Sequence, residues 1–299
     1  MKQAEVSSTE TKRLASHPNR VLGIDFSGAL NAGNRIWIAI GCVVGNTLRL
    51  EDCYPAKDLP ESSVSRDICL AALRRFVGTQ RGCVCGMDFP FGLPRSLVKE
   101  TSWKESVLHF GDRYQSPEEF REACRAASPG NELKRLTDRE SETPFSPYNL
   151  RIFRQTYFGI RDVLAPLVKD KLACVLPMQK PSPDKSWIVE VCPASTLKKK
   201  LHPYPSYKGS NKGKNEARAH ILSRIGERGY VLVPTVLQSR VVDDRVGMLL
   251  TALSPRRWPS VPPMTRLAFV FSEVKPTLSK GMYMFNWLKP SGGALSCLN

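Results

Sequence analysis

Short apolar runs separated by glycine and asparagine follow a polar leader in the first part of the chain. These runs span Arg20 to Phe26, Ile36 to Ile40 and Thr47 to Tyr54, and the turns between them contain Gly33-Asn34 and Gly45-Asn46. Apolar runs of this length are typical of strands, and tight Asn/Gly turns favour antiparallel hairpins. The pattern predicts an antiparallel meander of three strands.

The pattern then changes to a helical period. Ser62 and Ser63 are candidate N-caps for a helix that ends near Gly78. One face of this helix carries Ile68, Ala71, Ala72, Phe76 and Val77. The run from Cys83 to Asp88 is apolar again and ends in an acid, as Asp25 does in the first run. Because a helix separates this strand from the meander, a crossover and a parallel pairing are expected.

The remaining pattern predicts helices near 117–127 and 148–168, a strand over 187–191, and helices over 212–228 and 242–253. We interpret residues 1–19 as a mobile leader and residues 20–254 as one α/β domain. Residues of about 95–183 are a helical insertion within that domain. The segment 255–299, which is rich in proline and aromatic residues, is a C-terminal extension whose structure the pattern does not assign.

Acids stand at or near the ends of three of the predicted strands: Asp25, Asp88 and Glu190. Open α/β sheets bind ligands at the carboxyl ends of their strands, where Asp25 and Asp88 would project. Two carboxylates about 4 Å apart repel by roughly 4 kcal/mol at an effective dielectric constant of 20. A divalent cation would offset that repulsion, and Mg²⁺ or Mn²⁺ prefers oxygen ligands. We therefore predict a metal site.

Simpler roles for these acids stay open. A strand-end aspartate often caps the following turn or helix. Asp243 and Asp244 lie at the start of the predicted helix over 242–253, where one of them would serve as an ordinary N-cap. Their alternative role is to join the carboxylate cluster.

Composition adds a preference for polyanions. The chain has 44 Lys plus Arg against 28 Asp plus Glu, a formal charge of +16, and such an excess attracts nucleic acid above other partners. In the densest basic stretch Tyr204 and Tyr207 are interleaved with lysines, an arrangement that would neutralise phosphates and stack on bases. The predicted nucleic-acid-binding residues are Lys198, Lys199, Lys200, Lys208, Lys212, Lys214 and, outside the stretch, Arg161. A solvated loop is the alternative for the stretch, and surface ion pairing for Arg161.

Other functional classes find less support. The nine cysteines show no Cys-x-x-Cys pair, and the four histidines complete no zinc pattern. No stretch approaches the roughly 20 apolar residues of a membrane helix, and the N-terminus has no apolar core of a secretory signal. We expect a cytoplasmic protein with no membrane partner.

Several motifs, in order along the chain, resemble the predicted RNase H-like nucleases of domain-of-unknown-function family 429. They are GIDFSGA (23–29), GMDFPFGLP (86–94), PFSPYN (144–149), QTYFGIRDVL (155–164), EVCPAST (190–196) and VDDRVGMLLTAL (242–253). The resemblance implies a mixed sheet of five strands flanked by helices, with Asp25 on the first, central strand and Asp88 on the adjacent fourth strand. It also implies a last acid on a C-terminal helix beside them.

In such nucleases the carboxylates hold two divalent ions that align an attacking water with a phosphodiester. The resemblance thus implies Asp25, Asp88, Glu190 and Asp244 as catalytic residues, with Asp25, Asp88, Asp243 and Asp244 as metal ligands. One departure bears on activity: Gly247 occupies the position of the family's later acid, and Asp244 lies about one helical turn before it. A nucleic-acid-binding protein without turnover therefore stays an alternative, and an actin-like phosphotransferase or ATPase is a third.

Overall fold

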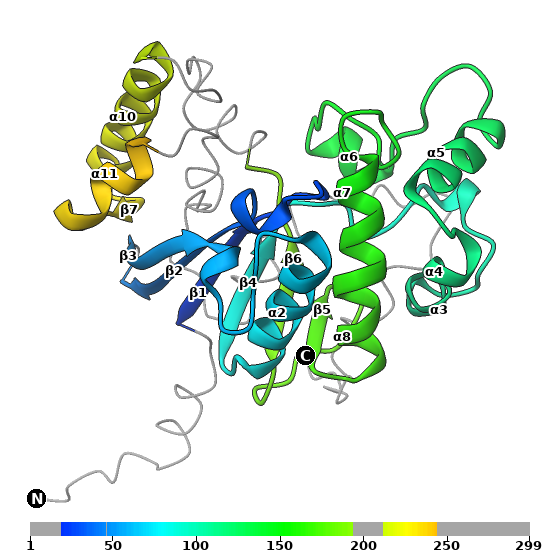
Figure 1. Ribbon diagram of the computed structural model, residues 1–299, viewed down its shortest axis with the longest axis horizontal. Coiled ribbons are helices and arrows are strands. Elements are labelled where there is room, and N and C mark those ends of the chain that lie inside the picture. The colour runs from blue at the N-terminus through cyan, green and yellow to red at the C-terminus, as the bar shows by residue number, and fades with distance from the viewer. Residues whose placement is uncertain (1–18, 46, 194–211, 244–299) are drawn as a thin grey trace, which may run out of the picture.

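One mixed sheet organises the molecule. The computed structural model describes residues 19–45, 47–193 and 212–243, and these contain a seven-stranded sheet in the order β5-β6-β4-β1-β2-β3-β7 (Figure 1). β1 (Arg20–Asp25), β2 (Trp37–Val44) and β3 (Thr47–Pro55) pair antiparallel, in sequence order. The predicted meander is therefore confirmed.

The other half of the sheet is parallel. β4 (Cys83–Met87) pairs with β1, and β6 (Ser186–Glu190) pairs with β4. The predicted crossover is thus also confirmed. Two short strands were not predicted: β5 (Ala173–Leu176) pairs with β6, and β7 (Val231–Leu232) pairs with β3. The α/β class holds, but the described sheet has seven strands rather than five, because runs of two and four residues carry little periodic signal.

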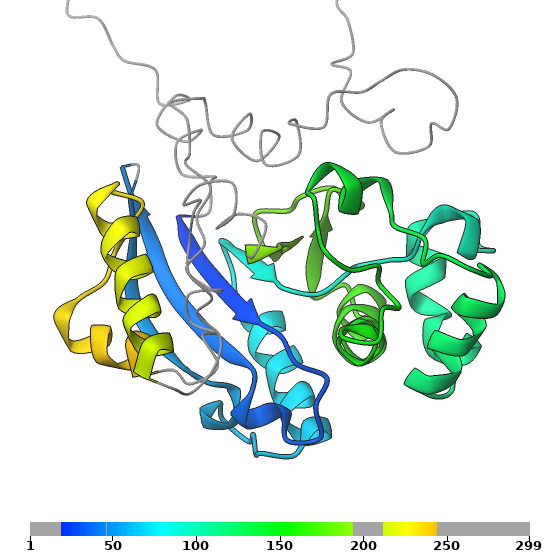
Figure 2. The ribbon, with the colours of Figure 1, turned by 90° about the horizontal axis from the view of Figure 1, so that it is seen from above.

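Helices pack on both faces of the sheet (Figure 2). On one face, α2 (Arg66–Thr79) lies beside a long helix formed by α7 (Phe153–Phe158), the π-helical turn η4 (Gly159–Leu164) and α8 (Ala165–Lys169). α10 (Lys212–Glu227) and α11 (Thr235–Asp243) cover the opposite face, against β2, β3 and β7.

Helix α2 differs from its prediction in the face that it buries. Ile68 was expected in the core and is 50% exposed, whereas Ala72 and Val77 are buried as predicted. The buried stripe runs instead through Cys69, Leu70, Ala72, Leu73 and Val77. Packing against the sheet and η4 thus buries a face of α2 that is rotated about the helix axis from the face predicted by hydrophobicity alone.

The helices of the C-terminal part were predicted with mixed success. α10 matches the expected helix over 212–228 closely. α11 begins at Thr235 rather than Val242, and its described part ends at Asp243. Asp243 is therefore not the N-cap of this helix, and for Asp243 that interpretation was wrong. Three predicted segments lie outside the described residues. They are the leader up to residue 18, the rest of the predicted helix from Asp244 to residue 253, and the extension over 255–299.

The predicted insertion is mainly helical. It contains η3 (Arg95–Leu97), α3 (Trp103–Leu108), α4 (Phe110–Arg113), α5 (Pro117–Ala126) and α6 (Leu136–Glu140), together with α7 to α8. Two shorter turns, η1 (Ala32–Asn34) and η2 (Ala56–Asp58), follow β1 and β3. Rings of Phe110, Tyr114, Phe120 and Tyr157 pack against one another and join α4 and α5 to α7. Within the described part of the chain, no helix combines the length and the apolar character needed to cross a membrane.

Candidate carboxylate site

Asp25 and Asp88 lie side by side at the carboxyl ends of two neighbouring parallel strands. Asp25 is the last residue of β1 and is only 2% exposed. Ile24 is level with Met87, and the Asp88 amide donates a hydrogen bond to the Ile24 carbonyl oxygen at 3.1 Å. The backbones of these acids are therefore about one strand spacing, ~4.8 Å, apart.

The pleat of the sheet places both acids on the face covered by α10 and α11. Asp25 is opposite Trp37 in the antiparallel pair, and Trp37 packs in the cluster beneath α10 and α11. Asp88 follows Met87, which lies in the core on the other face. Phe89, on the other side of Asp88, lies in that same core. Because side chains alternate along a strand and its continuation, Asp88 is directed to the same face as Asp25. The predicted pairing of these two acids follows from the register.

Glu190 does not join them. It is level with Met87 in the β4–β6 pair, which directs its side chain to the opposite face. Its carboxylate is already bound there. Arg135 donates from Nη2 to Oε1 at 2.5 Å and from Nη1 to Oε2 at 2.8 Å, and the Phe91 amide donates to Oε2 at 2.8 Å.

Arg135 links Glu190 to a second acid. Its Nε and Nη2 atoms donate to the two carboxylate oxygens of Asp138 at 3.0 and 2.6 Å, and its own amide donates to Oδ2 at 2.9 Å. Burial works to lower the pKa of Arg135, but Glu190 and Asp138 together hold that pKa above its ordinary value. We call Arg135, Asp138 and Glu190 the arginine clamp. It ties the start of α6 to the end of β6, and no motif or spacing in the sequence indicated Arg135 or Asp138.

Helix α7 and the turn η4 support the segments that follow both acids. Gln155 donates to the Asp88 carbonyl oxygen. A Cβ atom at Gly159 would lie 2.5 Å from the ring of Phe89, and one at Gly28 would lie 2.5 Å from the Arg154 carbonyl group. Gln155 thus holds the backbone of Asp88. The close packing at Gly159 could have been suspected from the sequence, because a glycine in the middle of a helical pattern often marks a close contact.

The residues predicted to bind nucleic acid are only partly described. The Arg161 guanidinium donates to Asp162 at 2.7 and 2.9 Å and to the Tyr157 hydroxyl at 3.1 Å, and Asp162 raises its pKa. This is the ion-paired arrangement that was the alternative for Arg161. Lys214 lies half-buried on α10, and Lys212 is the first residue of that helix. Lys198, Lys199, Lys200 and Lys208 lie outside the described residues.

Only some of the predicted metal ligands lie within the described residues. Asp25 and Asp88 offer hard oxygen ligands, the type that Mg²⁺ or Mn²⁺ prefers. Over residues 19–45, 47–193 and 212–243, no group of three or more His, Cys, Asp or Glu side chains is arranged to hold a metal ion. The further predicted ligands are on or beyond the end of α11: Asp243 is its last described residue, and Asp244 lies outside the described part. A metal ion at Asp25 and Asp88 would need at least one further ligand.

Comparison with known proteins adds no further constraint. Family models, curated proteins and solved structures were each searched, and none of them matches this chain. The similarity to RNase H-like nucleases thus rests on the six motifs alone, and the function is argued from the geometry of the carboxylates and their supports.

Proposed function

We propose that the chain is a metal-dependent nuclease with an RNase H-like fold, which hydrolyses phosphodiester bonds of DNA or RNA. The observation that carries this proposal is the placement of Asp25 and Asp88, level with each other at the ends of adjacent parallel strands and on one face of the sheet. Two carboxylates so placed are unfavourable unless a positive charge lies between or beside them.

The strand order supports the fold assignment. Three antiparallel strands in sequence order, followed by β4 and β6 parallel to β1 on its other side, give β3-β2-β1-β4-β6 within the larger sheet. Asp25 is thus on the first, central strand and Asp88 on the adjacent fourth strand, as the motif resemblance implies. α11, which ends in the described region at Asp243, packs on the same face as Asp25.

In this proposal Asp25 and Asp88 hold Mg²⁺ or Mn²⁺ together with Asp244. The bound ion would supply a water of lowered pKa and stabilisation for the charge that develops on the phosphate. The protein contributes position: Asp25 is buried at its strand end, and Gln155 fixes the backbone of Asp88. The excess positive charge of the chain raises the encounter rate with a polyanion. Glu190 is left out of the site because the arginine clamp engages its carboxylate.

A second function has one specific observation in its favour. Since Glu190 is bound by Arg135, the described strand ends provide two carboxylates rather than three. Together with Gly247 in place of the family's later acid, this favours a protein that binds nucleic acid without cleaving it. The two functions share the fold and differ in the response to metal.

One experiment separates the two functions. The full chain is incubated with labelled single- and double-stranded DNA and RNA in Mg²⁺, Mn²⁺ or EDTA, and cleavage and retention of the label are both measured. The variants are Asp25→Asn and Asp88→Asn. Asp184→Asn serves as the matched control because Asp184 is exposed and precedes β6, at the opposite end of that strand from the carboxyl ends where Asp25 and Asp88 lie.

The nuclease proposal expects cleavage in Mn²⁺ or Mg²⁺ that EDTA abolishes, with each strand-end variant at least about 100-fold slower, the loss expected for a group that stabilises the transition state. The Asp184→Asn protein should cleave as the unmodified chain does. Binding without cleavage in every metal supports the second function. Cleavage that persists in EDTA, or in both strand-end variants, contradicts the metal mechanism.

A further inference from the structure

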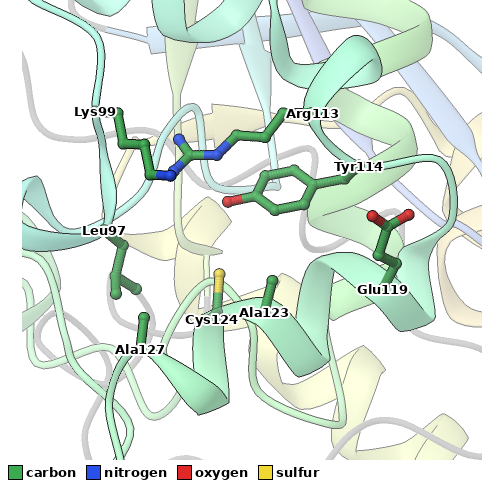
Figure 3. Close-up of a pocket in the computed structure, with 8 residues that line it drawn as sticks. All are labelled: Leu97, Lys99, Arg113, Tyr114, Glu119, Ala123, Cys124 and Ala127. Atoms are coloured by element: carbon green, nitrogen blue, oxygen red, sulfur yellow. The ribbon is translucent and has the colours of Figure 1, made fainter.

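A cavity in the helical insertion lies apart from the carboxylate pair and has a composition of its own. Its volume is about 330 Å³, and it lies between η3 and the helices α4 and α5. Leu97, Lys99, Arg113, Tyr114, Glu119, Ala123, Cys124 and Ala127 line it (Figure 3). This volume is at the small end of the range for small-molecule sites.

Two cationic side chains, Lys99 and Arg113, line the cavity. Figure 3 shows the Lys99 ammonium and the Arg113 guanidinium directed toward each other above the cavity. The Arg113 guanidinium has one ion pair, from Nη1 to Glu100 at 3.3 Å. Two cations that line one cavity favour an anion that binds between them.

The other polar groups of the lining do not supply that anion. Burial raises the pKa of Tyr114 to about 12 and the pKa of Cys124 to about 11, so both groups are protonated and neutral near pH 7. Their side chains are hydrogen-bonded to each other. Glu119 accepts from the Gln115 amide at 2.8 Å and lies on the far side of the Tyr114 ring from Lys99 in Figure 3.

The rest of the lining is apolar. Leu97 forms one wall, and Ala123 and Ala127 on the exposed side of α5 form the other, with the Cys124 thiol directed into the space between them and Tyr114. A ligand that fits both parts has one anionic head and a short apolar body. One negative charge is the appropriate number, because Glu100 already offsets part of the charge on Arg113.

From this cavity we infer a binding site for a small organic monocarboxylate, whose carboxylate lies between Lys99 and Arg113 and whose apolar body lies against Leu97, Ala123 and Ala127. The site is independent of the proposed nuclease function, because it shares no residue with the strand-end acids. Arg–carboxylate pairs are favourable in such half-buried places because the guanidinium offers paired donors.

The test is a calorimetric titration of the full chain with sodium hexanoate, with hexanamide as the uncharged probe of the same shape and inorganic phosphate as a second anion. Lys99→Gln removes one cation, and Ala123→Leu fills the apolar wall while keeping a good helix former. Lys104→Gln is the matched control, since Lys104 is an exposed lysine on the neighbouring α3 that does not line the cavity. Circular dichroism checks that each variant is folded.

We expect hexanoate to bind in the millimolar range or tighter and hexanamide to bind at least about tenfold more weakly, as the loss of a charge-assisted hydrogen bond implies. Lys99→Gln should weaken hexanoate by about tenfold, Ala123→Leu should weaken it further or abolish it, and Lys104→Gln should leave it unchanged. Equal binding of hexanoate and hexanamide would overturn the inference. The inference would also be overturned if hexanoate did not bind at about 10 mM. Binding of phosphate alone, with the same dependence on Lys99, would overturn it as well.

Discussion

The arginine clamp gives the sharpest prediction about stability. Substituting Arg135 with methionine keeps most of the apolar stem and removes the guanidinium, so four side-chain hydrogen bonds to Asp138 and Glu190 are lost. The two carboxylates then face each other without a cation. The substitution therefore tests whether the end of β6 and the start of α6 are held together by charge.

The burial of each partner sets the expected magnitude. The side chain of Arg135 is 12% exposed, that of Asp138 is 3% exposed and that of Glu190 is 32% exposed. Removing one partner of a buried pair costs about 3–5 kcal/mol, because the remaining charge has no compensation. We expect Arg135→Met to lower the free energy of unfolding by about this amount. Asp138→Asn should cost more than Glu190→Gln, whose loss of about 1–2 kcal/mol is smaller because water reaches Glu190.

Urea unfolding followed by circular dichroism measures these differences, provided that the slope with denaturant is unchanged among the variants. The double variant Arg135→Met/Glu190→Gln should recover part of the loss, since it relieves the repulsion between the two acids. A loss below about 1 kcal/mol for Arg135→Met, the range of an exposed pair, would refute the reasoning. A Glu190→Gln loss larger than that of Asp138→Asn would refute the use of burial to rank the two acids.

Two further predictions concern the packing behind the acids. Gly159→Ala should lower the free energy of unfolding by about 1–3 kcal/mol, since its Cβ would lie 2.5 Å from the ring of Phe89. The double variant Gly159→Ala/Phe89→Leu should lose less stability than the two single variants combined. Strictly additive losses in urea unfolding would contradict this contact. The second prediction concerns alkaline pH, because burial raises the pKa of the Cys69 and Cys83 thiols from 9.0 to about 11. The thiols lose their protons at lower pH in the unfolded chain than in the folded one, so the free energy of unfolding should be unaffected below pH 9. It should fall as the pH rises from 9 to 11, by up to about 2 kcal/mol per thiol. Replacing Cys83 with alanine should flatten this fall, and an unchanged slope would contradict it.

The sequence predicted the central part of the sheet well because each strand there is long enough to carry a period. Arg20–Asp25 and Cys83–Met87 read as buried apolar runs bounded by turn residues, and both are strands. Val231–Leu232 and Ala173–Leu176 were missed because short strands are defined by their partners rather than by their own pattern. The start of α11 at Thr235 was missed for a related reason: its buried residues are selected by the sheet beneath it.

The candidate site was likewise predicted in part from the sequence. Asp25 and Asp88 could be paired from the sequence because both close strands that a helical crossover makes parallel. Glu190 also ends a predicted strand, but its register with β4 directs its side chain to the other face of the sheet. The register between two strands that are distant in the chain cannot be predicted from the sequence of either strand alone. Arg135 could not be identified at all, since its partners are 3 and 55 residues away along the chain.

The central claim is that Asp25 and Asp88 form a metal site. The most direct measurement is the melting temperature of the full chain as a function of Mn²⁺ concentration, compared with EDTA. Ligand binding to the folded state raises stability by about 2.7 kcal/mol at 100 times the dissociation constant, so the melting temperature should rise with Mn²⁺ for the unmodified chain and for Asp184→Asn. The rise should be lost in Asp25→Asn and in Asp88→Asn. An equal rise in all four proteins, or none in the unmodified chain, would contradict the claim.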